Sequence, residues 1–294
     1  MTMRPARRRR TSLFLLLFAA IAVPVRAEDD LSTALEAFRS WKQGSPVSQL
    51  ARARQAVFRG TGDPAVRKAH EAALLAFLQT DADGQAKQRA LGWLGPIAGE
   101  ASVAPMLGLL DDPDLSSAAR GVLEQIPGPA ANKALVGALQ GPKLTDNARL
   151  GVIDSLARRN EAAGAAALVQ QLQATESAHH QAALVAALGT MDSPDALAAL
   201  HDQELDLEEL SVGTHGLAIL AIADRERARG NPTRASELYR QLLRECEGLK
   251  EEAFLGLLST SKSTRDALLR RGLADERLRD TALRRIHAGD LSLI

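Results

Sequence analysis

The chain has 294 residues, of which 46% are hydrophobic, 24% charged and 3% aromatic. This composition supports a hydrophobic core and excludes a wholly disordered chain, and the length allows one or two domains. Ala and Leu dominate while Val, Ile and the aromatic residues are sparse, which disfavours an all-β protein and indicates an all-α fold. Basic and acidic side chains number 36 each, so the whole chain has a formal net charge of zero.

Residues 1–27 predict an export signal. A basic start at residues 4–10 precedes an apolar stretch at residues 12–23, which is shorter than the roughly 20 residues that a membrane span needs. A small-x-small pattern ends at Ala27, so we expect cleavage after that residue; an uncleaved N-terminal anchor is the alternative. The protein would then be periplasmic or secreted, with no membrane contact after cleavage. Loss of six arginines and no acidic residue would leave a net charge of −6.

One apolar pattern recurs along the chain at an interval close to 30 residues. It consists of a small residue, two apolar residues, two variable residues and a final Ile or Leu, and it is least clean at its fifth occurrence. The occurrences are residues 92–97, 121–126, 151–156, 183–188, 217–222, 253–258 and 281–286. We expect each to mark the first helix of a repeated unit, with the small residue allowing helices to approach closely.

A second apolar signature lies between these occurrences. Its pairs are Met106/Leu110, Leu135/Leu139, Leu168/Leu172, Leu197/Leu200, Leu238/Leu242 and Leu269/Leu273. Their spacing places both side chains on one helical face, which predicts a second helix in each unit. A capping residue followed by proline predicts helix starts at Pro46, Pro64, Pro113, Pro194 and Pro232.

A two-helix unit of this length cannot bury its apolar face alone. We therefore expect neighbouring units, of roughly 29–36 residues each, to stack into an α-solenoid. An irregular all-α bundle is the alternative. Residues 28–46 predict an N-terminal capping helix with Leu31, Leu35 and Phe38 on one face, and residues 47–290 predict the repeat solenoid.

Two stretches resemble known helical repeats. AARGVLEQIPGPAANKALVGAL (residues 118–139) and ARLGVIDSLARRNEAAGAAALVQQL (residues 148–172) are similar to HEAT repeats of the short type found in exported bacterial proteins. Residues 229–246 are similar to the second half of a tetratricopeptide unit, so we expect a variant unit near residues 213–246. The resemblance implies an armadillo-like helical stack, and such repeats serve chiefly in scaffolds and adaptors.

The sequence offers no recognised catalytic motif. It contains no Gly-x-Ser-x-Gly elbow, no phosphate-binding lysine loop, no His-Glu-x-x-His and no cysteine pair. The lone Cys246 lies in an apolar-rich segment and is expected to be a small buried residue. His179 and His180 are adjacent and would point apart on a helix, which makes them a poor chelate. We therefore expect no catalytic residue, cofactor or metal.

A base-free stretch extends from Asn160 to Asp224. Its acidic residues gather in one segment, which gives the candidate partner-binding residues Asp202, Glu204, Asp206, Glu208 and Glu209. The negative electrostatic potential of these carboxylates could attract a basic partner surface or a hard cation. The alternative is a solvated loop between units. Residues 262–285 are rich in arginine, which would be a solvated face or one half of a head-to-tail contact with the acidic segment.

The leading hypothesis is a non-catalytic exported scaffold or adaptor. It would bind a protein or peptide on the surface made by the second helices, at exposed positions such as Lys133, Gln140 and Gln170. The expected acidic charge, the scarce aromatic residues and the export signal oppose nucleic-acid binding. One alternative is an enzyme or lyase accessory factor similar to HEAT-like proteins that act on bilin chromophores, with Cys246 as its only support. Another is a cation binder that uses the acidic segment.

Overall fold

The computed structural model describes residues 27–202, 209–260 and 263–286, and each regular element in these ranges is a helix. The all-α prediction is therefore confirmed for the described part of the chain. The α-helices are α1 Ala27–Phe38, α2 Val47–Phe58, α3 Pro64–Leu78, α4 Gly84–Leu94, α5 Val103–Leu107, α6 Ser116–Gln125, α7 Pro129–Gln140, α8 Asp146–Arg159, α9 Ala162–Ala174, α10 Ala178–Thr190, α11 Pro194–Asp202, α12 Glu209–Ala228, α13 Pro232–Glu245, α14 Lys250–Thr260, α15 Arg265–Ala274 and α16 Arg279–Leu283. Short 3-10 helices occupy Gly95–Ile97, Glu100–Ser102 and Glu247–Leu249.

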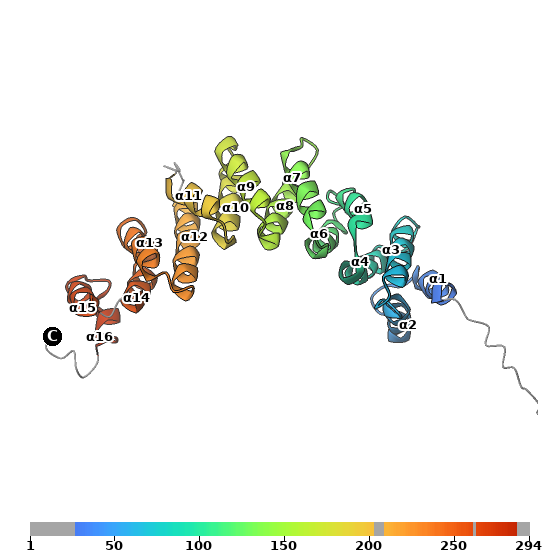
Figure 1. Cartoon of the computed structure of the whole chain (residues 1–294), viewed down its shortest axis with the longest axis horizontal. Helices are drawn as coiled ribbons and strands as arrows, with labels where there is room; N and C mark the ends of the chain where they lie inside the picture. The colour runs from blue at the N-terminus through green and yellow to red at the C-terminus, as the bar shows by residue number, and fades with distance from the viewer. Residues whose placement is uncertain (1–26, 203–208, 261–262, 287–294) are drawn as a thin grey trace, which may run out of the picture.

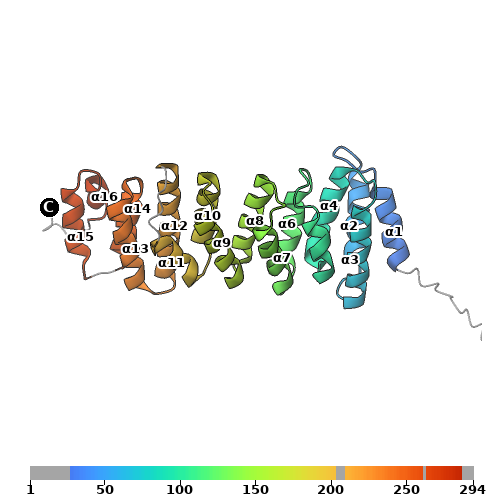
Figure 2. The same ribbon diagram turned by 90° about the horizontal axis from the view of Figure 1, so that it is seen from above.

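The helices form two layers along an arched array (Figure 1). In the inner layer, α4, α6, α8, α10, α12 and α14 each pack on the next, and α16 continues the row. The outer layer comprises α5, α7, α9, α11, α13 and α15. Figure 2 shows the same helices side by side from above. Packing is chiefly between neighbours in the chain, which is consistent with a helical-repeat solenoid.

Each sequence signature occupies its own layer. The recurring six-residue pattern lies on, or directly after, inner-layer helices, and its final residue is buried in every occurrence except the last, where Ile286 is partly buried. The paired apolar residues of the second signature lie on, or directly after, outer-layer helices and are buried apart from Leu197 and Leu273, which are partly buried. Over the described residues, this arrangement is consistent with the predicted units of two helices.

Aromatic residues close the N-terminal end of the array. Helix α1 packs on α2 and α3 and buries Leu31, Leu35 and Phe38, which are between 1% and 5% exposed. The Phe38 ring stacks on Trp41 with a centroid distance of 5.3 Å and lies 4.9 Å from the ring of Trp93. Large rings therefore fill the core between α1 and the helices that follow it.

Three of the five proline signals mark helix starts, because α3, α11 and α13 each begin at the predicted proline. Helix α2 begins one residue after Pro46, and Pro113 lies in a turn before α6. Asp112 explains the second difference, since its Oδ1 accepts hydrogen bonds from the backbone N of Asp114 and of Leu115, both at 2.9 Å. This turn satisfies the donors locally, so the helix starts later.

Arginines of one unit cap the helix C-terminus of the unit before it. The Arg159 side chain is 5% exposed and donates from Nη1 to the carbonyl oxygens of Leu123 at 2.7 Å and Ile126 at 2.9 Å. These carbonyls lie at the C-terminal end of α6, where they have no intrahelical donor. Arg225 of α12 donates in the same way to two carbonyls at the end of α10. These hydrogen bonds lock the spacing of successive inner helices.

The glycines that open the recurring pattern differ in how closely a neighbouring helix approaches them. A Cβ atom at Gly151 of α8 would lie 2.3 Å from the Cζ of Arg120 on α6, which agrees with the predicted close approach. A Cβ atom at Gly92 or Gly121 would meet nothing within 4 Å, so the expected tight contact is wrong at these two positions. A Cβ atom at Gly189 would lie 2.4 Å from the Cβ and 2.6 Å from the Cα of Ala218. Helices α10 and α12 therefore touch through their backbones at Gly189.

We predict opposite effects for two Gly→Ala substitutions. Gly189→Ala should lower the free energy of unfolding by about 1–3 kcal/mol, because the new methyl group forces α10 and α12 apart. Gly92→Ala, in open space within α4, should raise it by about 0.5–1 kcal/mol through helix propensity. Thermal unfolding followed by circular dichroism checks both. Equal effects of the two substitutions would contradict the close packing of α10 on α12.

Candidate functional site

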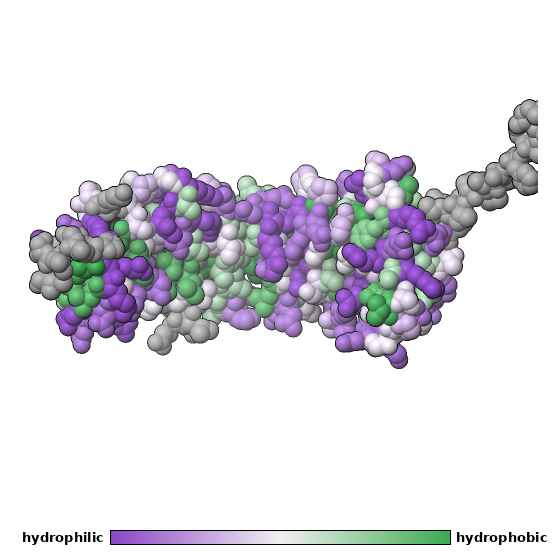
Figure 3. Space-filling model, turned by 90° about the horizontal axis from the view of Figure 1, so that it is seen from below, coloured by the Kyte–Doolittle hydropathy of each residue, from purple (hydrophilic) through white to green (hydrophobic). Residues whose placement is uncertain are grey.

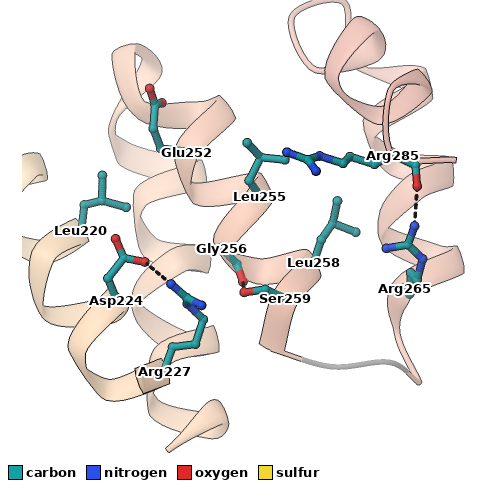
Figure 4. Close-up of a pocket in the computed structure, with 10 residues that line it drawn as sticks. All are labelled: Leu220, Asp224, Arg227, Glu252, Leu255, Gly256, Leu258, Ser259, Arg265 and Arg285. Carbon is teal, nitrogen blue, oxygen red and sulfur yellow. Dashed lines mark hydrogen bonds and ion pairs between the residues drawn. The ribbon is translucent and has the colours of Figure 1, made fainter. Parts of the chain in front are cut away.

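A groove of about 480 Å³ crosses the C-terminal part of the inner layer. The helices α15 and α16 and the residues directly after them form the last unit. The groove is lined by Leu220, Asp224 and Arg227 of α12, by Glu252, Leu255, Gly256, Leu258 and Ser259 of α14, and by Arg265 and Arg285 of this last unit. The floor is apolar, and charged side chains stand at both sides (Figure 4). Figure 3 shows hydrophobic residues along the middle of this face, bordered by hydrophilic ones.

A hydrogen-bonded network fixes the α12 side of the groove. The Tyr239 hydroxyl donates to Asp224 Oδ1 at 2.6 Å, and Arg227 donates from Nη2 to that same oxygen at 3.2 Å. Arg227 Nε also donates to the Tyr239 hydroxyl oxygen at 3.2 Å. Because every member has a partner of complementary charge or polarity, the network holds Asp224 and Arg227 in place at the rim.

Tyr239 itself is fully buried behind the groove. A Cβ atom at Gly256 would lie 2.2 Å from the Tyr239 Cε1, so the glycine makes room for the ring. Burial and the hydrogen bond to Asp224 raise the pKa of Tyr239 to about 12. The phenol therefore stays protonated well into the alkaline range and acts as a donor that anchors the Asp224 carboxylate.

The opposite side of the groove is basic. Arg265 at the start of α15 donates to the backbone carbonyl oxygen of Arg285, which ties the two ends of the last unit together. The Arg285 side chain extends over the groove toward Leu255 (Figure 4). Neither Arg285 nor Glu252 has an ion-pair partner among the described residues. These two charges are thus available to an incoming ligand.

Exposed leucines extend the apolar surface on the inner helices. Leu217 of α12 is 57% exposed and lies one turn before Leu220, on the same helical face. Leu283 of α16 is 45% exposed. Large apolar side chains this exposed are rare in the described part of the chain, where Val47 is the one other example. An apolar strip with charged edges is typical of an interaction surface.

The five predicted acidic residues lie at the junction of α11 and α12. Glu204, Asp206 and Glu208 fall outside the described residues, while Asp202 ends α11 and Glu209 begins α12. The side chains of Asp202 and Glu209 also fall outside the described residues. The acidic segment therefore stays a prediction.

Cys246 is buried, as the sequence predicts. Burial and the charge of Glu245 raise the pKa of its thiol, so the reactive thiolate is disfavoured. A Cβ atom at Gly216 would lie 2.8 Å from the Cys246 Sγ, which shows how closely α12 covers the sulfur. The residue behaves as a packing element.

The histidines singled out by the sequence are separate from one another. The His179 and His180 ring centroids are 6.2 Å apart, and His180 Nε2 lies 3.8 Å from Asp146 Oδ1. His215 Nε2 is instead 2.6 Å from the carbonyl oxygen of Leu200. Across the described residues, no three His, Cys, Asp or Glu side chains gather in a group that could hold a metal ion.

The exposed positions proposed on the second helices lie on the outer layer. Lys133 and Gln140 belong to α7 and Gln170 to α9, and all three are exposed. Gln140 Nε2 donates to Gln170 Oε1 at 3.3 Å, so two of them are joined across a unit boundary. The groove lies on the other layer, built by first helices.

Sequence reasoning missed the groove because its residues come from separate units. Asp224, Arg227 and Arg285 converge only after α12, α14 and the last unit stack. One signal was present: the fifth occurrence of the pattern carries Leu217 where most others carry Gly or Ala. That departure marks the exposed leucine beside the groove.

Among the residues that the structure describes, none of the helices combines the length and the hydropathy that a membrane span requires. No family model, no curated protein and no solved structure matches the chain. The resemblance to HEAT repeats accordingly rests on the sequence units alone.

We predict that the single tyrosine of the chain titrates abnormally. Its pKa is raised in the folded protein, so its stabilising contribution is complete below about pH 10 and is lost as the pH rises toward 12. The absorbance of tyrosinate at 295 nm should therefore rise near pH 12 in the folded protein and near pH 10 in denaturant. Tyr239→Phe should remove the signal and flatten the alkaline loss of stability. A folded-state midpoint near pH 10 would contradict the network.

Proposed function

We propose that the protein is a non-catalytic, exported scaffold or adaptor that binds an extended segment of a partner protein in the inner groove. The observation that carries the proposal is the groove itself, where an apolar floor on α12 and α14 lies between a fixed Asp224 and Arg227 pair and the basic side of Arg265 and Arg285. Residues 4–27 support export.

The chemistry of the groove favours a peptide with both apolar and acidic side chains. Leu220, Leu255 and Leu258 offer contacts to one or two apolar side chains, which supply most of the affinity in such interfaces. Arg285 lacks an ion pair within the described residues and can bind a carboxylate in a bidentate manner. A preformed groove on packed helices also loses little conformational freedom on binding.

This proposal places the binding surface on the first helices of the units, whereas the sequence favoured the second helices. The outer positions Lys133, Gln140 and Gln170 lie on exposed helix surfaces away from the residues that line the groove. The enzyme alternative loses its one supporting residue, because the thiol of Cys246 is buried and its pKa is raised.

Selection of displayed peptides tests the groove while the partner is unidentified. Random peptides selected on the immobilised protein should converge on sequences that combine apolar and acidic residues. Ser259 is exposed on α14 at the groove, so Ser259→Trp should leave the fold intact and fill the groove. The affinity for the selected peptides should then fall by about tenfold or more. Fluorescence polarisation measures the affinities.

A matched control places the same side chain on the outer layer. Gln170 is also exposed, on α9, so Gln170→Trp adds a tryptophan without touching the groove and should leave peptide affinity unchanged. Failure to enrich any peptide, or equal weakening by both substitutions, would refute the groove as the binding surface. Circular dichroism of both variants confirms that the fold is retained.

A further inference from the structure

A second cavity lies between the outer helices α13 and α15, separate from the groove. It has a volume of about 390 Å³, and α14 forms its base. Its lining comprises Leu243, Phe254, Leu257, Leu268, Gly272 and Leu278, with Arg240, Arg244, Lys250, Arg271 and Asp275 around them. No lining residue is shared with the inner groove, because the two cavities use opposite faces of α14.

The base of the cavity is apolar and well packed. Phe254 and Leu257 are each 2% exposed, and Leu278 is 5% exposed. A Cβ atom at Gly272 would lie 2.5 Å from the Phe254 Cζ, so the absence of a side chain at this position of α15 makes room for the tip of the ring. The base therefore offers a preformed apolar surface, as in sites for small molecules.

The rim of the cavity is strongly cationic, with four basic side chains and one carboxylate. Asp275 is already engaged, since its Oδ1 accepts hydrogen bonds from the backbone N of Arg277 at 3.0 Å and of Leu278 at 3.2 Å. Lys250 pairs outside the lining, with Glu247 at 2.6 Å.

Two of the cations at the rim are unpaired. Neither Arg240 nor Arg271 has an ion pair among the described residues. With four basic side chains against the single carboxylate of Asp275, the rim carries a net positive charge that attracts an anionic group.

We propose that this cavity binds a small amphipathic anion, an alkyl chain of medium length that ends in a single carboxylate. The chain would lie against the partly exposed Leu243 and Leu268, above the buried Phe254 and Leu257, and the carboxylate would meet Arg240 and Arg271. The volume of about 390 Å³ falls at the small end of the roughly 300–1,000 Å³ typical of small-molecule sites, which suits one alkyl chain better than the two chains of a diacyl lipid. This site is independent of the proposed peptide groove.

Calorimetric titration of the purified protein with dodecanoate, below its micelle-forming concentration, tests the proposal. We expect binding of one dodecanoate per chain and none of dodecyltrimethylammonium, which has the same tail and the opposite charge. Arg240→Glu combined with Arg271→Glu should lower the affinity for dodecanoate by about tenfold or more. Leu268→Trp, which adds a ring to the cavity wall, should abolish binding.

The matched control is Lys133→Glu combined with Arg270→Glu, which changes the net charge equally and alters no residue of the cavity. It should bind dodecanoate as the unaltered protein does. The proposal is overturned if dodecanoate does not bind, if dodecyltrimethylammonium binds equally, or if both double variants weaken binding alike. It is also overturned if the protein binds phosphatidylglycerol vesicles or acidic peptides through Arg240 and Arg271 while dodecanoate is not bound.

Discussion

Burial of apolar surface between successive units is the constraint on which the whole molecule depends. A pair of short helices exposes one apolar face, and that face becomes a core only when the next pair covers it. Arginine side chains add directional hydrogen bonds to this apolar packing, since Arg159 and Arg225 donate to backbone carbonyl oxygens at the ends of α6 and α10. A charged donor that satisfies carbonyls of the previous unit fixes the offset between units as well as their contact. Two of the junctions between inner helices are therefore tied by hydrogen bonds as well as by apolar packing.

The same constraint explains why both binding candidates lie near the C-terminal end. The core is continuous from α1 to α14, but Phe254, Leu258, Leu269, Leu278 and Ala282 form a second, small cluster of their own. Helix α14 thus contributes residues to both clusters. The last unit packs on this helix and leaves one concave space on its inner face and another on its outer face. The inner space becomes the groove with Asp224, Arg227 and Arg285, and the outer space becomes the cavity with the cationic rim. Imperfect stacking at one junction creates two concave surfaces.

The regular spacing of apolar residues in the sequence predicted those features of the fold that depend on regular packing. The two helices of each unit, the buried leucine pairs and the burial of Cys246 all follow from residue type and spacing. Contacts between units could not be read in this way, because the position of Gly189 against Ala218 depends on the rotation of α10 relative to α12. The groove was missed for the same reason, and its Tyr239 to Asp224 hydrogen bond joins residues of different helices. The arginine-rich end was visible in composition, but composition does not say which arginines lack a partner.

Amide hydrogen exchange of the protein with and without a selected peptide tests the central claim that α12, α14 and the last unit together form the partner site. Binding in the groove should slow exchange in α12 and α14 and at residues 279–286, and should leave α5, α7 and α9 unchanged. Protection confined to the outer layer, or to the acidic residues 202–209, would contradict the account.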